Sequence, residues 1–403
     1  MDSGMGFYNE AMHDGASVST PLTRLIRTAI ERNGGWLPFD RFMAMALYAP
    51  GLGYYANPSR KFGTLPQSGS DFVTAPELST VFGAALARQV AQALTASGTD
   101  ELWEFGAGSG ALAAQLLDAL AGMGQGVRRY SIVELSGVLR ERQRERLAAH
   151  GATVQWVDAL PDHMTGVVIG NEVLDAMPVQ LLEFDGSKWS ERGVVDDVAA
   201  TRDVNSASGS RAIAGDPPTM PAFAWATRAT RLRPPLHTAF PPGTVTEIHA
   251  QAEAFIATLA ERLRRGAAFF IDYGFPQAEY YHPQRSGGTL MCHRAHCADA
   301  DPLVDVGIKD ITAHIDFTAL SLAAQDGGME VIGYTTQAHF LMNCGVLELL
   351  QGADLKTTAN TQKLLTEHEM GELFKVIGFA KGCDLGFSAA AIGFTHGDRT
   401  HTL

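Results

Sequence analysis

Glu101-Leu-Trp-Glu-Phe-Gly-Ala-Gly-Ser-Gly110 joins a short apolar segment to three closely spaced glycines. Residues 111–120 follow directly and are strong helix formers. A strand, a glycine turn and a helix in this order open a nucleotide-binding α/β unit, because glycines turn tightly and let a ligand approach the backbone without a clash with Cβ. We therefore expect Gly106, Gly108 and Gly110 to line a cofactor site.

The glycines alone do not identify the cofactor. Gly106-x-Gly108-x-x-Ala111 also satisfies the dinucleotide fingerprint, so a nicotinamide cofactor stays open at this point. Glu104 favours a different ligand, because an acid at the end of the strand attracts a cationic group and repels a pyrophosphate. S-adenosylmethionine (SAM) carries an ammonium and a sulfonium. We expect Glu104 to bind the ammonium of SAM, and the alternative is a solvated acid at a strand end.

The composition is that of a globular protein without a general nucleic-acid function. The chain has 403 residues, 46% of them hydrophobic, and a formal net charge of −13, whereas nucleic-acid binders present a basic surface. Four cysteines at irregular spacing predict no disulfide framework and a reducing compartment. The first twenty residues contain no Lys or Arg, and no apolar run is long enough to span a bilayer. We expect a cytoplasmic protein with no membrane span.

Repeated β-α units follow the glycine turn. Expected strands cover 101–105, 130–133, 153–157, 166–170 and 267–271, and expected helices cover 111–121, 136–150 and 251–265. Apolar strands that alternate with helices predict an α/β fold with a parallel, doubly wound sheet. Ligands of such sheets bind beyond the carboxyl ends of the strands. Outside this region we expect a helix from Thr74 to Leu94 and a hairpin of residues 179–184 with 189–195.

Three strand ends carry candidate cofactor or catalytic groups. Glu134, at the end of the second strand, is suited to accept both ribose hydroxyls, in SAM and nicotinamide enzymes alike. Asp158, after the third strand, is suited to an adenine amino group, although a plain loop aspartate is an equal alternative. After the fourth strand, the carboxylates of Glu172 and Asp175 match the planar fork of a guanidinium, next to Asn171. The alternative there is a helix cap with surface acids.

Cys292-His-Arg-Ala-His-Cys297 contains residue types that bind zinc but not their usual spacing. Structural zinc sites more often pair Cys-x₂₋₄-Cys with a second ligand pair far along the chain, and no second cluster appears in this sequence. We expect no metal.

A set of motifs follows in order over about residues 20 to 390: Leu52-Gly-Tyr-Tyr55, Asp71-Phe-Val-Thr-Ala-Pro-Glu77, Phe82-Gly83, Glu104-x-Gly-x-Gly-x-Gly110, Val133-Glu134-x-Ser136, Leu139-Arg140-x-x-Gln143, Asn171-Glu-x-x-Asp-Ala-x-Pro178, Asp272-Tyr-Gly274, Gly288-Thr-Leu290, Asp310-Ile-Thr-Ala-His-Ile-Asp-Phe317, and Thr336-Gln337 with Phe340-Leu341. With these motifs the chain resembles the MidA-like methyltransferase family. These are bacterial SAM-dependent proteins similar to the mitochondrial complex I assembly factor that methylates an arginine.

The resemblance implies SAM as the cofactor and a class I methyltransferase core with a Rossmann-like doubly wound sheet. It also implies that Asp71, Thr74 and Glu77 belong to the cofactor site and that Asp272 assists catalysis. The side chains expected in a substrate groove are Tyr54, Tyr55, His314, Asp316 and Gln337. The acceptor would be a protein arginine, with a respiratory complex I subunit as a candidate partner and a homodimer as a candidate assembly.

The alternatives that stay open are a SAM-binding assembly factor, a small-molecule methyltransferase and a nicotinamide-dependent oxidoreductase. The expected organisation has six segments: a flexible N-terminus (1–20), an N-terminal helical segment with a SAM-site loop (21–97), the SAM-binding core (98–195), a variable loop (196–222), the remainder of the core sheet (223–275), and C-terminal α+β additions around the substrate groove (276–403).

Overall fold

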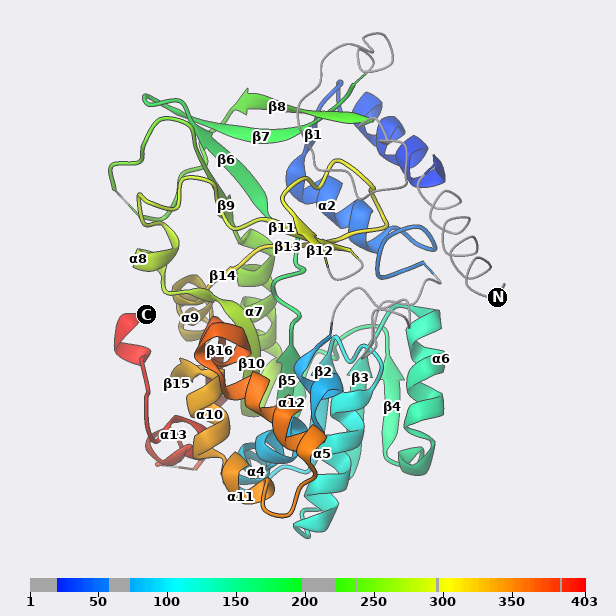
Figure 1. The fold of residues 1–403 in the computed structure, drawn as a ribbon, viewed down its shortest axis with the longest axis vertical. Coiled ribbons are helices and arrows are strands. Elements are labelled where there is room, and N and C mark those ends of the chain that lie inside the picture. The colour runs from blue at the N-terminus through cyan, green and yellow to red at the C-terminus, as the bar shows by residue number, and fades with distance from the viewer. Residues whose placement is uncertain (1–19, 58–72, 198–221, 237, 295–296, 385) are drawn as a thin grey trace. The chain divides into compact units, whose positions relative to one another are not determined.

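The computed structural model describes residues 20–57, 73–197, 222–236, 238–294, 297–384 and 386–403 (Figure 1). The chain divides into two compact units. Unit 1 comprises Met1–Lys61, Ala176–Ala250 and Tyr281–Ala313, and unit 2 comprises Phe62–Asp175, Gln251–Tyr280 and His314–Leu403. The predictions of a flexible N-terminus and of a variable loop fall almost wholly outside the described residues, and the prediction for Asp71 falls outside them entirely.

Unit 2 is built on an eight-stranded sheet with the order β15-β16-β10-β5-β2-β3-β4, and β14 pairs with β10 (Figure 1). Its strands are β2 (Glu101–Phe105), β3 (Arg129–Val133), β4 (Val154–Val157), β5 (Met164–Asn171), β10 (Leu263–Phe275), β14 (Ile315–Asp316), β15 (Glu330–Thr336) and β16 (Phe374–Lys381). From β10 to β4 the neighbouring strands run parallel, whereas β16 is antiparallel to both β10 and β15. The predicted α/β, doubly wound fold is confirmed, with antiparallel pairing added at one edge.

The strand order reverses between β2 and β5. From β2 the chain proceeds to β3 and β4 on one side, and it then returns to form β5 on the other side of β2. Such a switch point opens a crevice at the carboxyl ends of the two strands, because the connections leave in opposite directions. The glycine turn after β2 and the polar residues after β5 therefore lie at the same edge of the sheet.

Both faces of this sheet are covered by helices. On one face, α4 (Thr80–Ser97) and α5 (Ala111–Gly122) pack in a core cluster with Leu102 and Ile169, which are fully buried. On the other face, α7 (Ala250–Arg262) inserts Phe255 between Phe105 and Phe270, with ring centroids 4.9 and 5.9 Å apart. Burial on both faces explains why the strands read as continuous apolar runs.

Two predicted boundaries are wrong. The helix expected from Thr74 to Leu94 is broken into α3 (Ala75–Leu78) and α4, because Ser79 is extended (φ −149°) and its hydroxyl accepts the N–H of Val81 as a new helix cap. Helix α7 ends at Arg262, before the expected residue 265, because β10 starts at Leu263 and pairs with β5 from there on.

The remaining helical elements of unit 2 are α6 (Gly137–Arg146), η2 (Ala148–His150), α8 (Gln277–Tyr280), α9 (Phe317–Asp326), α10 (Gln337–Asn343), α11 (Val346–Leu349), α12 (Leu355–Leu365), η3 (Glu367–Gly371), α13 (Phe387–Ala390), η4 (Ile392–Phe394) and η5 (Thr400–Thr402). In the described part of the chain no helix is both long and apolar enough to cross a membrane.

Unit 1 contains a helix over residues 20–32 and two antiparallel sheets. Its other elements are β1 (Leu37–Pro38), α2 (Phe39–Tyr48), β6 (Gln180–Phe184), β7 (Trp189–Asp196), β8 (Phe223–Ala229), β9 (Thr244–Ile248), β11 (Met291–Arg294), β12 (Cys297–Asp299) and β13 (Asp310–Thr312). The predicted hairpin is present as β6 and β7, with Asp185 accepting the backbone N–H groups of Ser187 and Lys188 in its turn.

The compact units divide the chain differently from the expected segments. The hairpin was expected within the core segment 98–195, but its strands pair with β1, β8 and β9 and not with the parallel sheet. Because of these pairings, the segment Ala176–Ala250 belongs to unit 1.

Candidate active site

The glycine turn has a backbone that only glycine adopts easily. Gly106, Gly108 and Gly110 have φ angles of +63°, +52° and +81°, in the left-handed region. A Cβ at Gly106 would also lie 2.6 Å from Cγ2 of Val173, which belongs to the loop after β5. The turn and that loop are thus in close contact at the switch point, and a side chain at Gly106 would force them apart.

Glu104 lies in β2, two residues before the turn, and is not a solvated acid. It is only 2% exposed, and Tyr130 of β3 donates a hydrogen bond of 2.8 Å to its carboxylate. Burial raises the pKa of Glu104 from its ordinary value of 4.5 to about 7, although the hydrogen bond from Tyr130 lowers it. The alternative of a solvated strand-end acid is therefore wrong, and Glu104 is a buried titratable group two residues before the first glycine.

Gln143 of α6 connects the glycine turn to Glu134. Its side-chain amide nitrogen donates to the backbone oxygen of Gly108 at 2.9 Å and to the carboxylate of Glu134 at 3.3 Å. Its amide oxygen accepts from the indole of Trp156 at 2.8 Å, and Gln143 is fully buried. Burial, as the largest cause, raises the pKa of Glu134. Only the motif Leu139-Arg140-x-x-Gln143 signalled this residue in the sequence.

Asp158 is held in place by an arginine of the same helix. Arg140 donates to the carboxylate of Asp158 and to the backbone oxygens of Glu134 and Val157. The side chain of Asp158 remains 79% exposed. Leu135, directly after Glu134, is 78% exposed, so an acid and an open apolar side chain lie next to each other at the end of β3.

Glu77 also reaches the glycine turn. Its carboxylate accepts hydrogen bonds from the hydroxyl of Ser109, within the turn, and from Arg146 of α6 at 2.6 Å. Arg146 bonds the hydroxyl of Ser109 as well, so three segments meet there. The side chain of Thr74 makes no cap bond to α3, and its backbone oxygen accepts from the N–H of Glu77 at 3.0 Å.

Asp272 holds the loop that follows β5. One oxygen of its carboxylate accepts the backbone N–H groups of Val173, Leu174 and Asp175 at 3.2, 2.9 and 3.2 Å. Asp272 is only 1% exposed, and burial, followed by the carboxylates of Asp175 and Glu172, raises its pKa well above the ordinary value. Because its carboxylate accepts these backbone N–H groups, we propose that Asp272, which was expected to assist catalysis, does so by positioning this loop.

Glu172 is the strained residue of this loop. Its φ of +53° lies in the left-handed region, which costs a residue other than glycine about 1–3 kcal/mol. The side-chain nitrogen of Asn171 donates to its carboxylate at 3.0 Å, and the side-chain oxygen of Asn171 is buried without a hydrogen-bond partner among the described residues. Asp175 is 5% exposed and accepts from the hydroxyl of Tyr273. Carboxylate and amide oxygens thus gather after β5, as expected of a site for a cationic donor group.

The expected groove residues are found in different surroundings. His314 lies against the rings of Tyr273 and Phe275, with centroids 5.1 and 5.2 Å away. Asp316 caps α9, and burial raises its pKa to about 6. Gln337 is fully buried and donates to the backbone oxygen of Leu364 at 3.0 Å, so it packs between helices rather than lining a groove.

Tyr54 and Tyr55 belong to unit 1. Tyr54 is 1% exposed, and the hydroxyl of Tyr55 bonds the carboxylate of Asp310 at 2.9 Å. In the same unit Cys292 is buried and Cys297 is exposed, on neighbouring strands. Among the described residues, no three His, Cys, Asp or Glu side chains are grouped as metal ligands would be.

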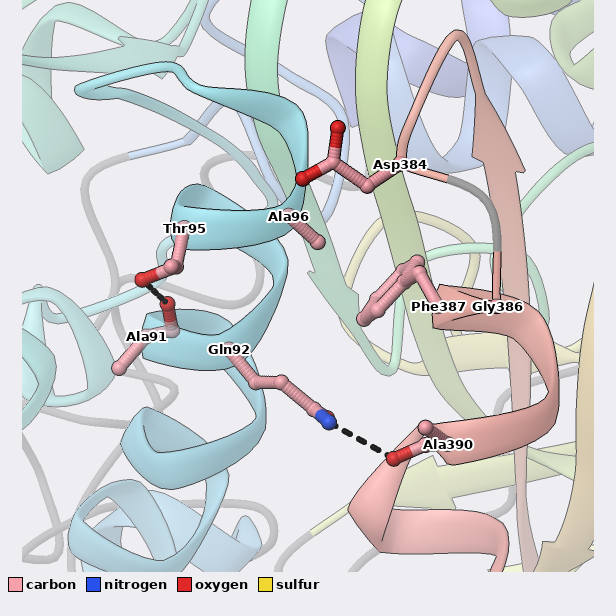
Figure 2. Close-up of a pocket in the computed structure, with 8 residues that line it drawn as sticks. All are labelled: Ala91, Gln92, Thr95, Ala96, Asp384, Gly386, Phe387 and Ala390. Atoms are coloured by element: carbon pink, nitrogen blue, oxygen red, sulfur yellow. Dashed lines mark hydrogen bonds between the residues drawn. The ribbon is translucent and has the colours of Figure 1, made fainter.

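Figure 2 shows a groove beside the C-terminal end of α4, from which the chain leads into the start of β2. Its volume is about 600 Å³, and it is lined by Ala91, Gln92, Thr95, Ala96, Asp384, Gly386, Phe387 and Ala390. None of the predicted site residues is among them.

SAM suits the groups found at the switch point. The three glycines of the turn have positive φ angles that other residues rarely adopt, and the buried acid Glu104 precedes the first of them by two residues. Glu134 and the exposed Leu135 offer a hydroxyl acceptor next to an apolar surface, which matches an adenosine.

Comparisons with known proteins support SAM as the cofactor. Residues 85–335 match the model of a family described as "Putative S-adenosyl-L-methionine-dependent methyltransferase". The structure is similar to that of a Burkholderia thailandensis protein bound to S-adenosyl-homocysteine, with a TM-score of 0.87 and 48% identity, over 97% of this chain and 98% of the other.

Two curated relatives are the mitochondrial protein arginine methyltransferase NDUFAF7 homolog of Drosophila melanogaster and NDUFAF7 of Mus musculus. They are 28% and 27% identical to this chain, over 82% and 88% of it and 76% and 83% of their own lengths. The resemblance to MidA-like proteins and SAM as the cofactor are thereby confirmed. The chain belongs to the family of S-adenosyl-L-methionine-dependent methyltransferases that its residues 85–335 match.

Proposed function

We propose that this methyltransferase transfers the methyl group of SAM to an arginine guanidinium of a protein substrate. The observation that carries the proposal is the group of oxygens after β5: the carboxylates of Glu172 and Asp175 and the unpartnered, buried amide oxygen of Asn171. A guanidinium offers five N–H donors in a planar fork, which such oxygens match. The names of the distant mitochondrial relatives support the same acceptor.

The cofactor would extend from the glycine turn to the end of β4. In this proposal Glu104, when ionised, attracts the methionine ammonium from beneath Gly106, Gly108 and Gly110. Glu134 accepts the ribose hydroxyls, Leu135 packs on the adenine, and Asp158 accepts its amino group. Asp71, Thr74 and Glu77 complete the methionine side.

In the reaction the bond between the sulfonium sulfur and the methyl carbon breaks as a bond to a guanidinium nitrogen forms. The guanidinium is almost always protonated and is a poor nucleophile, so positioning dominates catalysis. Glu172 and Asp175 would orient one nitrogen in line with the methyl group, and a carboxylate accepts the proton that this nitrogen gives up. S-adenosylhomocysteine and the methylated arginine are the products.

The partner is inferred from the resemblance, and the compartment is inferred from the cysteines. A respiratory complex I subunit is the acceptor that the resemblance to the mitochondrial assembly factor implies. We propose a cytoplasmic location, because all four cysteines are free, as in proteins of reducing compartments.

The test is transfer of a labelled methyl group from SAM in a lysate of cells that lack this protein. Wild-type protein should label a protein band, and acid hydrolysis of that band should yield methylarginine. Glu172→Gln should bind S-adenosylhomocysteine as wild type does and lose most of the labelling, because it removes charge and little volume. Wild-type labelling by Glu172→Gln and Asp175→Asn would refute the carboxylate grip, and an absence of any labelled protein would favour an assembly factor that acts by contact.

A further inference from the structure

Helix α3, which carries Glu77 to the glycine turn, is held by side chains of other helices. The backbone oxygen of Pro76 accepts from the amide of Gln115 in α5 at 2.7 Å. The backbone oxygen of Leu78 accepts from the amide of Asn360 in α12 at 2.9 Å. A helix of four residues does not maintain its own shape in water, because its few internal hydrogen bonds do not offset the cost of nucleation. The bonds on either side of Glu77 therefore determine where its carboxylate lies.

A second bond from α12 holds the break between α3 and α4. The hydroxyls of Ser79 and Thr361 are 2.7 Å apart, and the two residues are 5% and 0% exposed. The hydroxyl of Thr361 also lies 2.8 Å from the backbone oxygen of Thr357, and when Thr361 donates its single hydrogen there, Ser79 is the donor to Thr361. The oxygen of Ser79 meanwhile accepts the N–H of Val81 and starts α4. Thr361 thereby fixes the residue at which the chain turns from one helix into the other.

We propose that Asn360 and Thr361 are positioning residues for the cofactor. They hold α3 so that the carboxylate of Glu77 meets the hydroxyl of Ser109 in the glycine turn and the guanidinium of Arg146. Ser79 and Thr361 are 282 residues apart, so this contact gives part of the C-terminal region a role on the cofactor side, in addition to the expected substrate groove. The inference rests on the assignment of Glu77 to the SAM site under the proposed function.

The test measures the affinity of the full chain for S-adenosylhomocysteine by calorimetry, together with its melting temperature. Thr361→Val keeps the size of the side chain and removes the hydrogen-bond partner of the Ser79 hydroxyl, and Asn360→Ala removes the bond to Leu78. Each should raise the Kd about threefold to tenfold, which corresponds to one neutral hydrogen bond.

Thr358→Val is the matched control. Its hydroxyl bonds the backbone oxygen of Asp354 at 2.9 Å, four residues earlier, as that of Thr361 bonds Thr357, but Thr358 is exposed. Loss of the same intrahelical bond should therefore leave the Kd unchanged.

A double-mutant cycle separates positioning from general destabilisation. Glu77→Gln should weaken binding by itself, and in that background Thr361→Val should have no further effect on the Kd, because its influence passes through Glu77. The inference is overturned if Thr361→Val and Asn360→Ala stay within about twofold of the wild-type Kd, or if Thr361→Val acts as strongly in the Glu77→Gln background. It is also overturned if Glu77→Gln binds as wild type does. Because the readout is binding, these results do not depend on whether the acceptor is an arginine.

Discussion

The pKa of Glu104 predicts a pH dependence of stability that one substitution removes. Glu104 is 2% exposed, and burial raises its pKa from 4.5 to about 7 in the folded protein. Between these two pH values the folded chain binds a proton that the unfolded chain has released. The free energy of unfolding must therefore fall as the pH rises through this window. The favourable contribution is complete below pH 4.5 and is lost above about pH 7.

The size of the effect follows from the separation of the two pKa values. At 1.36 kcal/mol per pH unit, a rise from 4.5 to about 7 corresponds to roughly 3 kcal/mol. Glu104→Gln carries no titrating proton, so wild type should lose roughly 3 kcal/mol more than this variant between pH 4.5 and 7. Other buried acids, such as Asp316, titrate in both proteins and cancel in the difference.

The assay is urea unfolding without cofactor, followed by tryptophan fluorescence at several pH values from 4.5 to 8.5. Tyr130→Phe provides a second check, because it should keep the pH dependence that Glu104→Gln removes and shift it along the pH scale. Because the hydrogen bond from Tyr130 lowers the pKa of Glu104, its removal should raise that pKa and move the loss of stability to higher pH. Parallel stability profiles for wild type and Glu104→Gln would refute the reasoning.

Three further predictions concern the loop, the cofactor and the metal. Asp272→Ala leaves the backbone N–H groups of Val173, Leu174 and Asp175 without their acceptor, so it should lower the free energy of unfolding by about 3 kcal/mol or more. It should also reduce the rate of methyl transfer more than the affinity for S-adenosylhomocysteine. Equal losses of both, measured by transfer assay and calorimetry, would contradict its role in positioning the loop. Glu134→Ala should weaken SAM binding by about 1–3 kcal/mol in calorimetry, while NAD(H) should give no heat with either protein, and tight NAD(H) binding would contradict the cofactor assignment. Elemental analysis should find no stoichiometric zinc, and chelators should leave the melting temperature unchanged; one equivalent of zinc that disappears in Cys292→Ser would show the opposite.

Much of the candidate cofactor site could be predicted from local sequence. An apolar strand, three glycines and a helix-forming segment follow one another within twenty residues, and each obeys a short-range rule. The acids at the ends of β3, β4 and β5 could likewise be located, because parallel strands direct their carboxyl ends to one edge of the sheet. The period of the apolar residues and the positions of the turns were sufficient for these predictions.

The tertiary structure alone decided what each of these acids does. The partner of Glu104 is Tyr130 on the next strand, and Asp272 binds amides almost a hundred residues away. The contact between Ser79 and Thr361 joins α4 to a helix of the C-terminal region. No local pattern encodes such partners, because burial and hydrogen bonding depend on which segments the fold brings together. For that reason the sequence by itself determined at which strand ends the acids lie. The packing determined which of them are buried, which accept hydrogen bonds from the backbone and which are accessible to a ligand.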